Sequence, residues 1–178
     1  MLASEALEAL DEELWIASRP LPLWVGDVGT RMTVMRLVGG DLLLHSPVSL
    51  DPALRGALDR IGRVRWVVGP SRVHHLFLGD YASAYPSAEL WGAPDLAFNV
   101  QPGAKNRAKV FHWLVGANGR FGPHRIIRAV LRDHEAARGS LAKLLEWDFD
   151  RIIVTHGDVL EHGGREALRA AFSFLRPE

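Results

Sequence analysis

The sequence predicts a layered α/β (α+β) fold, and three observations support this class. From Arg31 to Trp91, the local patterns give a β-hairpin, a helix, a strand, a second helix and another strand. Strands that alternate with helices are typical of a sheet packed against helices. The 178 residues, 48% of them hydrophobic, suffice for one core but not for two full domains. No internal repeat or linker interrupts the chain, so we expect one domain over residues 1–178.

Composition excludes several classes of protein. The 21 Lys and Arg residues balance the 21 Asp and Glu residues, and cysteine is absent. Balanced charge argues against a nucleic-acid partner, and a chain without cysteine has neither disulfides nor thiolate metal sites. No apolar run reaches the roughly 20 residues of a membrane-spanning helix, and Glu5 and Glu8 argue against a signal peptide. We therefore expect a soluble cytoplasmic domain whose metals, if present, are bound by His, Asp or Glu.

Local patterns place the first elements. Leucines at a loose helical spacing predict a helix up to about Ala17. Alternating β-forming residues over 31–37 and an apolar run over 42–45 predict a β-hairpin, because two glycines and an aspartate lie between them. Ser49 or Asp51 is expected to cap a helix that ends near residue 62.

The rest of the chain also alternates between predicted strands and helices. The exception is residues 95–122, whose many glycines indicate a loop. The expected elements are strands over 64–68, 88–91 and 151–155, helices over 73–85 and 123–131, a helix capped by Asp133 that buries Leu141, Leu144 and Leu145, and a final amphipathic helix after Gly164.

Four histidines follow predicted strands. His45 ends the hairpin, His74 and His75 follow the strand over 64–68, and His156 follows the strand over 151–155. Loops at strand ends are where α/β proteins bind ligands, and imidazole is a common ligand of zinc and iron. A hydrogen-bonded structural role is the alternative for each of these histidines.

The chain from about residue 20 onward resembles the metallo-β-lactamase fold superfamily. The resemblance rests on a strand, a loop with a His pair, a helix and a late strand ending in His-Gly. It is carried by the phrases RLVGGDLLLHSPVSL, VVGPSRVHHLFLGDYASAYPSAELWGAP and WDFDRIIVTHGDVLEHGGREAL. They look most like an uncharacterised bacterial branch known as a domain of unknown function. The resemblance implies an αββα sandwich, shortened here by an internal deletion near Asp95, in a superfamily of ester, amide and phosphoester hydrolases.

The metal motif of that superfamily is altered in this sequence. Its pattern His-x-His-x-Asp-His falls on Pro70, Arg72, His74 and His75. Neither proline nor a cationic arginine binds a metal ion, so the first of the two usual metal sites is lost. The resemblance then implies one zinc or iron ion, bound by His74, His75 and His156.

Other residues would complete such a site by the same resemblance. Asp95 matches the aspartate that bridges the metals, or it is a loop residue. His45 stands where the superfamily more often has an acidic residue. It would be a fourth ligand, a hydrogen-bond partner of a ligand, or a structural residue. Asp158 would orient an imidazole or form an Asx turn. Arg72 would stabilise a developing oxyanion.

Two hypotheses of function follow. The first is a metal-dependent hydrolase of a small-molecule ester or phosphoester. Residues 96–132 contain seven basic and no acidic residues. These basic residues form either a solvated face or a rim that favours anionic substrates. The alternative is a degenerate, non-catalytic member of the fold that binds a ligand or a partner.

Overall fold

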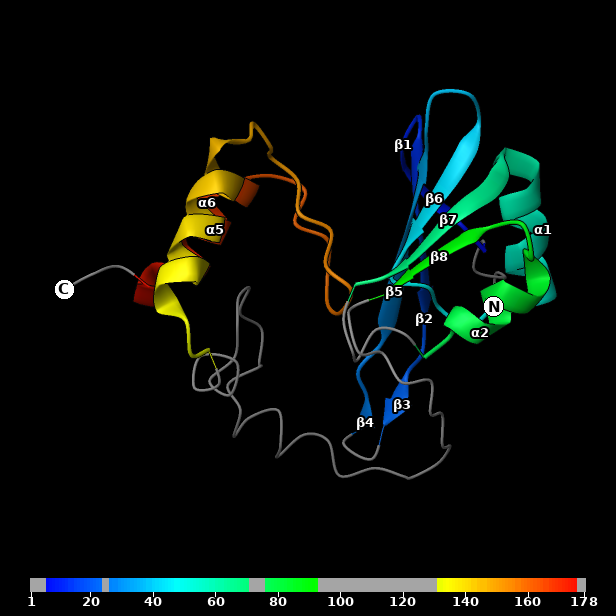
Figure 1. Cartoon of the computed structure of the whole chain (residues 1–178), viewed down its shortest axis with the longest axis horizontal. Coiled ribbons are helices and arrows are strands. Elements are labelled where there is room, and N and C mark those ends of the chain that lie inside the picture. Colours follow the sequence, from blue (N-terminus) through cyan, green and yellow to red (C-terminus); the bar gives the residue numbers. More distant parts are fainter. Residues whose placement is uncertain (1–5, 24–25, 71–75, 93–130, 176–178) are drawn as a thin grey trace. The chain divides into compact units, whose positions relative to one another are not determined.

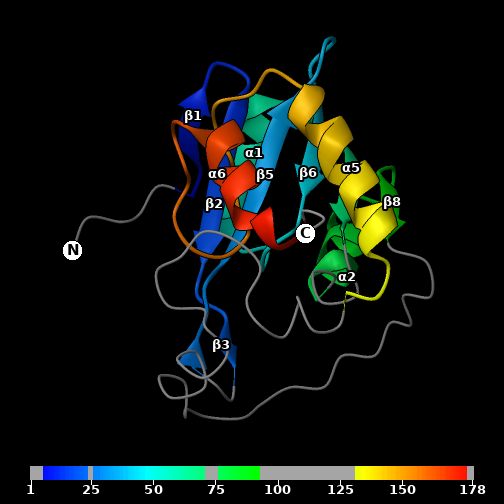
Figure 2. The ribbon, with the colours of Figure 1, turned by 90° about the vertical axis from the view of Figure 1, so that its left-hand side faces the viewer.

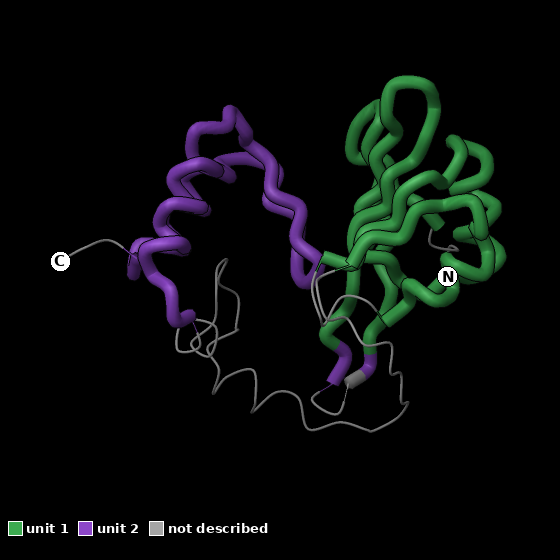
Figure 3. The backbone as a smooth tube through the Cα atoms, in the orientation of Figure 1, with its two compact units in different colours: residues 1–21, 28–103 green, residues 22–27, 104–178 purple. Residues whose placement is uncertain are grey.

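The computed structural model describes residues 6–23, 26–70, 76–92 and 131–175, and the chain divides into two compact units (Figures 1 and 3). Unit 1 comprises residues 1–21 and 28–103, and unit 2 comprises residues 22–27 and 104–178. The single domain expected from the sequence stays a prediction.

Unit 1 is built on a six-stranded sheet of order β1-β2-β5-β6-β7-β8. The strands β1, β2, β5 and β6 pair antiparallel, whereas β6, β7 and β8 are parallel. The carboxyl ends of the three parallel strands therefore lie at one edge, called the carboxyl edge below. The strands are β1 (Glu8–Asp11), β2 (Leu14–Arg19), β5 (Thr30–Arg36), β6 (Asp41–His45), β7 (Arg63–Gly69) and β8 (Glu89–Gly92).

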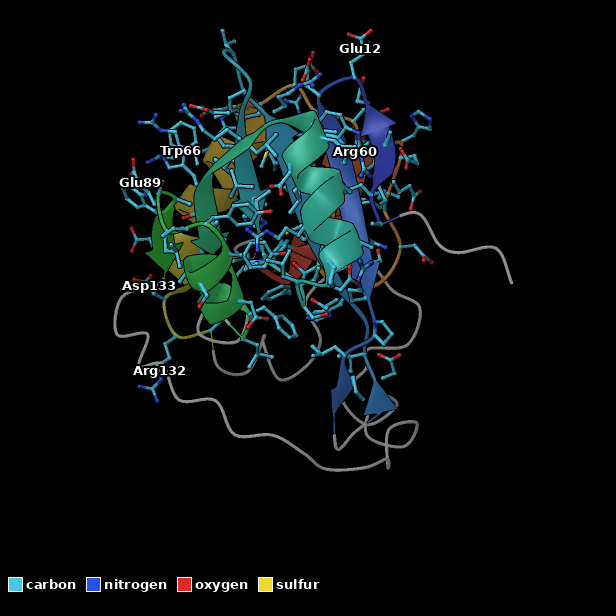
Figure 4. The ribbon with its side chains drawn as sticks, turned by 90° about the vertical axis from the view of Figure 1, so that its right-hand side faces the viewer. Glu12, Arg60, Trp66, Glu89, Arg132 and Asp133 are labelled. Carbon is cyan, nitrogen blue, oxygen red and sulfur yellow. The ribbon has the colours of Figure 1, made fainter. Side chains whose placement is uncertain are left out.

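Two helices, α1 (Pro52–Ile61) and α2 (Leu78–Ala84), cover one face of this sheet. Figure 4 shows both helices in front of the strands. Parallel strands need such crossover connections, and here each crossover contains one helix. Alternate strand residues meet the helices in a core of fully buried side chains that includes Met32, Val34, Leu42, Leu44, Leu54, Leu58, Val67, Leu78 and Tyr81.

The helix expected up to about Ala17 was wrong, because β1 and β2 occupy this region. All six residues of β2 pair with β5, from Leu14 opposite Met35 to Arg19 opposite Thr30. Ile16 and Ala17, in the middle of this strand, are almost completely buried. Long-range pairing and burial thus outweigh a loose helical spacing of leucines.

The hairpin and the first helix of unit 1 are confirmed. Gly39 and Gly40 have φ of 97° and 84°, a left-handed conformation that favours glycine at the turn between β5 and β6. Asp51, rather than Ser49, is the N-cap of α1, and its Oδ1 accepts a hydrogen bond of 2.7 Å from the backbone N–H of Leu54. The expected helix over 73–85 is confirmed only as α2, since residues 71–75 lie outside the described residues.

Unit 2 contains a two-stranded hairpin and a pair of helices. The hairpin pairs β3 (Pro22–Leu23) with β4 (Gly26–Asp27). The helices α5 (His134–Glu146) and α6 (Gly164–Ala171) pack against each other and against a short 3-10 helix, Ser173–Leu175 (Figure 2). No helix in the described part of the chain is long and apolar enough to cross a membrane.

Two expectations for unit 2 were wrong. Although Asp133 caps α5 as expected, Leu144 is exposed and none of the α5 side chains is fully buried. The strand expected over 151–155 is reduced to an isolated bridge between Ile152 and Leu160. The chain reverses direction between these two residues. The apolar residues over 151–155 therefore do not form a strand that pairs over several residues. The helix and loop expected within 95–130 lie outside the described residues.

The buried pair of Tyr81 and Met32 makes a testable prediction about stability. The Tyr81 hydroxyl donates a hydrogen bond of 3.3 Å to the Met32 thioether, and both side chains are fully buried. Met32→Leu removes the acceptor and should lower the free energy of unfolding by about 1–3 kcal/mol, because the hydroxyl is left unpaired. Tyr81→Phe leaves only a weak acceptor unpaired and should cost less. In urea unfolding, the double variant should recover most of the Met32→Leu loss. Additive losses would contradict this.

The N-cap of α1 makes a second prediction. Asp51→Ala should lower the free energy of unfolding by about 1 kcal/mol, since it removes the acceptor for the Leu54 N–H. Asp51→Asn keeps a capping side chain but loses the 3.1 Å ion pair that the half-exposed Asp51 makes with Arg19, and should cost less. The capping bond lowers the pKa of Asp51 below its ordinary value of 3.8. Its contribution to stability is therefore present above pH 3.8 and lost as the pH falls further. Equal losses in both variants would contradict a capping role.

Candidate functional site

The carboxyl edge of the sheet brings together the ends of the three strands β6, β7 and β8. Site residues were predicted from the sequence at or after each of these strand ends. His45 at the end of β6 aligns with Val68 in β7, and Gly69 at the end of β7 aligns with Gly92 at the end of β8. Since the three strands are parallel, the chain leaves each of them at the same edge. This is the usual position of ligand sites in open sheets with parallel strands.

The register of the strands places His45 on the sheet face opposite the helices. Its neighbours Leu44 and Val67 are fully buried in the core under α1 and α2, and side chains alternate between faces along a strand. His45 therefore belongs to a row on the second face. The pairings across the sheet give this row as Ile16, Thr33, His45, Val68 and Trp91.

The electrostatics of this position favour a neutral imidazole. The His45 side chain is half-buried, and burial lowers the pKa of His45 below its ordinary value of 6.5. The ring is therefore uncharged at neutral pH. Only the neutral ring has a lone pair with which to bind a metal ion or accept a proton.

Ser46, directly after His45, has an unusual backbone conformation that the sequence did not reveal. Its φ of 60° is the only positive φ of a non-glycine residue in the parts of the chain that the structure describes. Ser46 is buried, and its backbone N–H donates a hydrogen bond of 2.8 Å to the carbonyl oxygen of Val68. This left-handed residue ends β6 and ties its end to β7. Such strained positions are frequent at functional sites.

Four predicted site residues, Arg72, His74, His75 and Asp95, lie outside the described residues. In the sequence, the first three follow β7 and Asp95 follows β8. Within the described residues, no group of three or more His, Asp or Glu side chains lies close enough together to hold a metal ion. The predicted ligand set therefore stays a prediction.

His156 belongs to unit 2, where it is exposed and lies in a bend at residues 155–157 instead of at the end of a strand. Gly157 follows it with φ of 90°, a conformation that favours glycine. Asp158 is exposed as well.

A hydrogen-bonded pair that the sequence did not reveal closes the base of the loop that carries His156. The Asp150 carboxylate lies 2.8 Å from His162 Nδ1 and accepts 2.6 Å from the backbone N–H of Gly163. The hydrogen bond to His162, followed by that from Gly163, lowers the pKa of Asp150. The Asp150 and His162 side chains are both exposed, so this pair lies at the surface of unit 2.

The comparisons with known proteins agree with this architecture. The chain belongs to the family described as Domain of unknown function (DUF4336), whose match covers residues 11–101, just over half of the chain. No curated protein matches the chain.

The fold itself is shown by similar solved structures. The chain resembles the metallo-β-lactamase FIM-1 from Pseudomonas aeruginosa in its mono-zinc form, with a TM-score of 0.59 and 11% identity over 96% of both chains. It also resembles the metallo-β-lactamase DIM-1 exposed to ceftazidime, with a TM-score of 0.55 and 10% identity over 96% of this chain and 97% of the other. A metallo-β-lactamase from Hirschia baltica has a TM-score of 0.56 and 13% identity over 97% of this chain and 98% of its own. These likenesses show that the chain has the metallo-β-lactamase fold, which confirms the predicted fold class.

The lowered pKa of His45 predicts a pH dependence of stability in protein treated with a chelator. Below its ordinary pKa of 6.5, His45 takes up a proton more readily in the unfolded chain than in the folded one. Its contribution to the free energy of unfolding is therefore present above pH 6.5 and lost as the pH falls toward the folded-state pKa. Urea unfolding at pH 7.5 and 5.5 should show a smaller loss on acidification for His45→Gln than for the wild type. The exposed His134 provides a control, because His134→Gln should keep the wild-type loss; identical losses in all three proteins would contradict the prediction.

Proposed function

We propose that the chain is a metal-dependent hydrolase with one zinc or iron ion at the carboxyl edge, acting on a small ester or phosphoester. One observation carries this proposal. The parallel strands β6, β7 and β8 end at the same edge, where β6 presents the half-buried His45. The predicted ligands His74, His75 and Asp95 follow β7 and β8 in the sequence.

The chemistry of these residues fits one metal ion. The neutral imidazole of His45 is in the protonation state that metal binding needs. His74, His75 and Asp95 would supply the other donors on this unit, and His156 enters the proposal on the resemblance alone. Pro70, directly after β7, occupies the first position of the superfamily motif, which favours one metal ion over two. A mono-zinc form is known for the similar fold of FIM-1.

A bound zinc or iron ion would lower the pKa of a water molecule and polarise the oxygen of an ester or phosphoester. The chain's own residues would do the rest. His45 would bind the ion or orient a ligand that does, and burial would keep its ring uncharged. Arg72 would stabilise negative charge that develops on the substrate oxygen.

A cytoplasmic location and the lack of a nucleic-acid partner belong to the same proposal. They rest on the absence of cysteine and on equal numbers of acidic and basic residues.

The second candidate is a non-catalytic member of the fold that binds a ligand or partner. The specific observation in its favour is the replacement of the two leading motif histidines by Pro70 and Arg72. Such a protein would hold no stoichiometric metal, which separates the two candidates experimentally.

The metal content of the purified protein tests this proposal. Protein purified without added metal should contain about one equivalent of zinc or iron, and a chelator should lower its melting temperature, because a metal ion stabilises the state that binds it. His75→Ala and His45→Ala should each lose metal, whereas the exposed His134→Ala should retain it.

Two results would count against the proposal. A metal-free wild type with a melting temperature indifferent to chelator would favour the non-catalytic candidate. Full metal content in folded His45→Ala and His75→Ala variants would show that the metal is bound elsewhere.

A further inference from the structure

We propose that Ser46 is a positioning residue for His45, and that its left-handed backbone at the end of β6 holds the imidazole at the carboxyl edge. This inference rests on the proposed function and adds the residue that fixes a proposed metal ligand. The observation behind it is the φ of 60° at Ser46. A side chain with a Cβ makes this conformation unfavourable, so the chain keeps a strained residue directly after His45.

The residue that follows makes the conformation of Ser46 less favourable still. Pro47 restricts the residue before it to extended conformations, which have a negative φ. Glycine tolerates a positive φ without this cost, and glycine occupies every other position with a positive φ in the described ranges. A strained residue of this kind persists only where its surroundings hold it in place, and such residues cluster at functional sites.

Buried contacts on both sides of Ser46 hold the turn. Its backbone N–H donates a hydrogen bond of 2.8 Å to the Val68 carbonyl oxygen in β7, and Ser46, Pro47 and Val48 are buried in succession. Val48 belongs to the core under α1 and α2, whereas His45 lies on the opposite face of the sheet. The chain therefore passes round the end of the sheet within three residues, and the turn at Ser46 begins this passage.

The turn fixes the position of His45. His45 is the last residue of β6, where it pairs with Thr33 in β5 and Val68 in β7. The hydrogen bond from Ser46 to Val68 is the next one toward the edge. A strand end frays when the residue after it is free to move, and fraying would release His45 from the second face. A restricted Ser46 therefore holds the imidazole in place before a metal ion binds, which reduces the entropy that binding must remove.

Cobalt(II) binding tests the inference. Protein stripped of metal with a chelator, and then freed of the chelator, would be titrated with cobalt(II), with the absorption spectrum of the ion as the readout. Ser46→Gly should weaken binding about two- to fivefold, because glycine adds backbone freedom at the end of β6. Ser46→Ala keeps a Cβ and with it the backbone restriction, and should bind within about twofold of the wild type.

Ser49→Gly is the matched control. Ser49 lies in the same connection between β6 and α1, beyond the buried Val48. The same substitution there adds the same backbone freedom on the far side of the buried segment, so cobalt(II) affinity should equal that of the wild type. Urea unfolding establishes which variants are folded. If Ser46→Gly does not fold, Pro47→Ala carries the test, because it removes the restriction that proline places on Ser46 and should weaken binding in the same direction.

Two readouts in metal-free protein show whether residue 46 acts on His45 itself. In Ser46→Gly, the protection of the residue 46 amide against hydrogen exchange should fall about two- to fivefold, while the Leu44 amide keeps its wild-type protection. Diethyl pyrocarbonate acylates neutral imidazole and should modify the half-buried His45 faster in Ser46→Gly than in the wild type. The rate at the exposed His134 should be the same in both proteins.

The two proposals fail on different results. If the wild type binds no cobalt(II) but both metal-free readouts change as expected, the hydrolase proposal fails and the positioning role stands. If the wild type binds one equivalent and folded Ser46→Gly binds it as tightly, the Ser46 proposal is overturned and the hydrolase proposal stands. Equal weakening by Ser46→Ala or by Ser49→Gly would also overturn it, because the effect would then come from the hydroxyl or from a general loosening of the connection.

Discussion

The parallel pairing of β6 with β7 and of β7 with β8 is the constraint on which the rest of unit 1 depends. It aligns His45 with Val68 and Gly69 with Gly92, so the chain leaves all three strands at one edge. Parallel strands cannot be joined by tight turns, and α1 and α2 are part of the connections that this pairing requires. Both helices cover the same face, and His45 lies on the other.

Register is as important to the site as strand order. Within β6, Leu44 is fully buried under the helices while His45 is on the opposite face. A slip of one residue would exchange these two positions, placing an imidazole in the apolar core and a leucine at the proposed site. The buried residues that fix the register therefore also fix the direction of His45, which links the stability of unit 1 to its proposed chemistry.

Local signals predicted the parts of the fold that local chemistry determines. The glycine turn before β6, the Asp51 cap of α1 and the Asp133 cap of α5 each act within a few residues, and each is confirmed. The first strands and the segment over 151–155 were mistaken because their structure depends on partners distant in the sequence. The same holds at the site. That His45 ends a strand followed from the local pattern, whereas the hydrogen bond of the left-handed Ser46 to Val68 depends on the pairing of β6 with β7.

The central claim is that the carboxyl edge of β6, β7 and β8 holds the metal ion, and paramagnetic broadening in NMR spectra tests it most directly. Protein loaded with one equivalent of cobalt(II) in place of its own metal would be compared with protein loaded with diamagnetic zinc. The account predicts that backbone amide signals of Ser46, Gly69 and Gly92 are broadened, while those of Asp41 and Arg63 at the opposite ends of β6 and β7 remain sharp. Broadening centred on Asp41 and Arg63, or none along β6 and β7, would contradict the account.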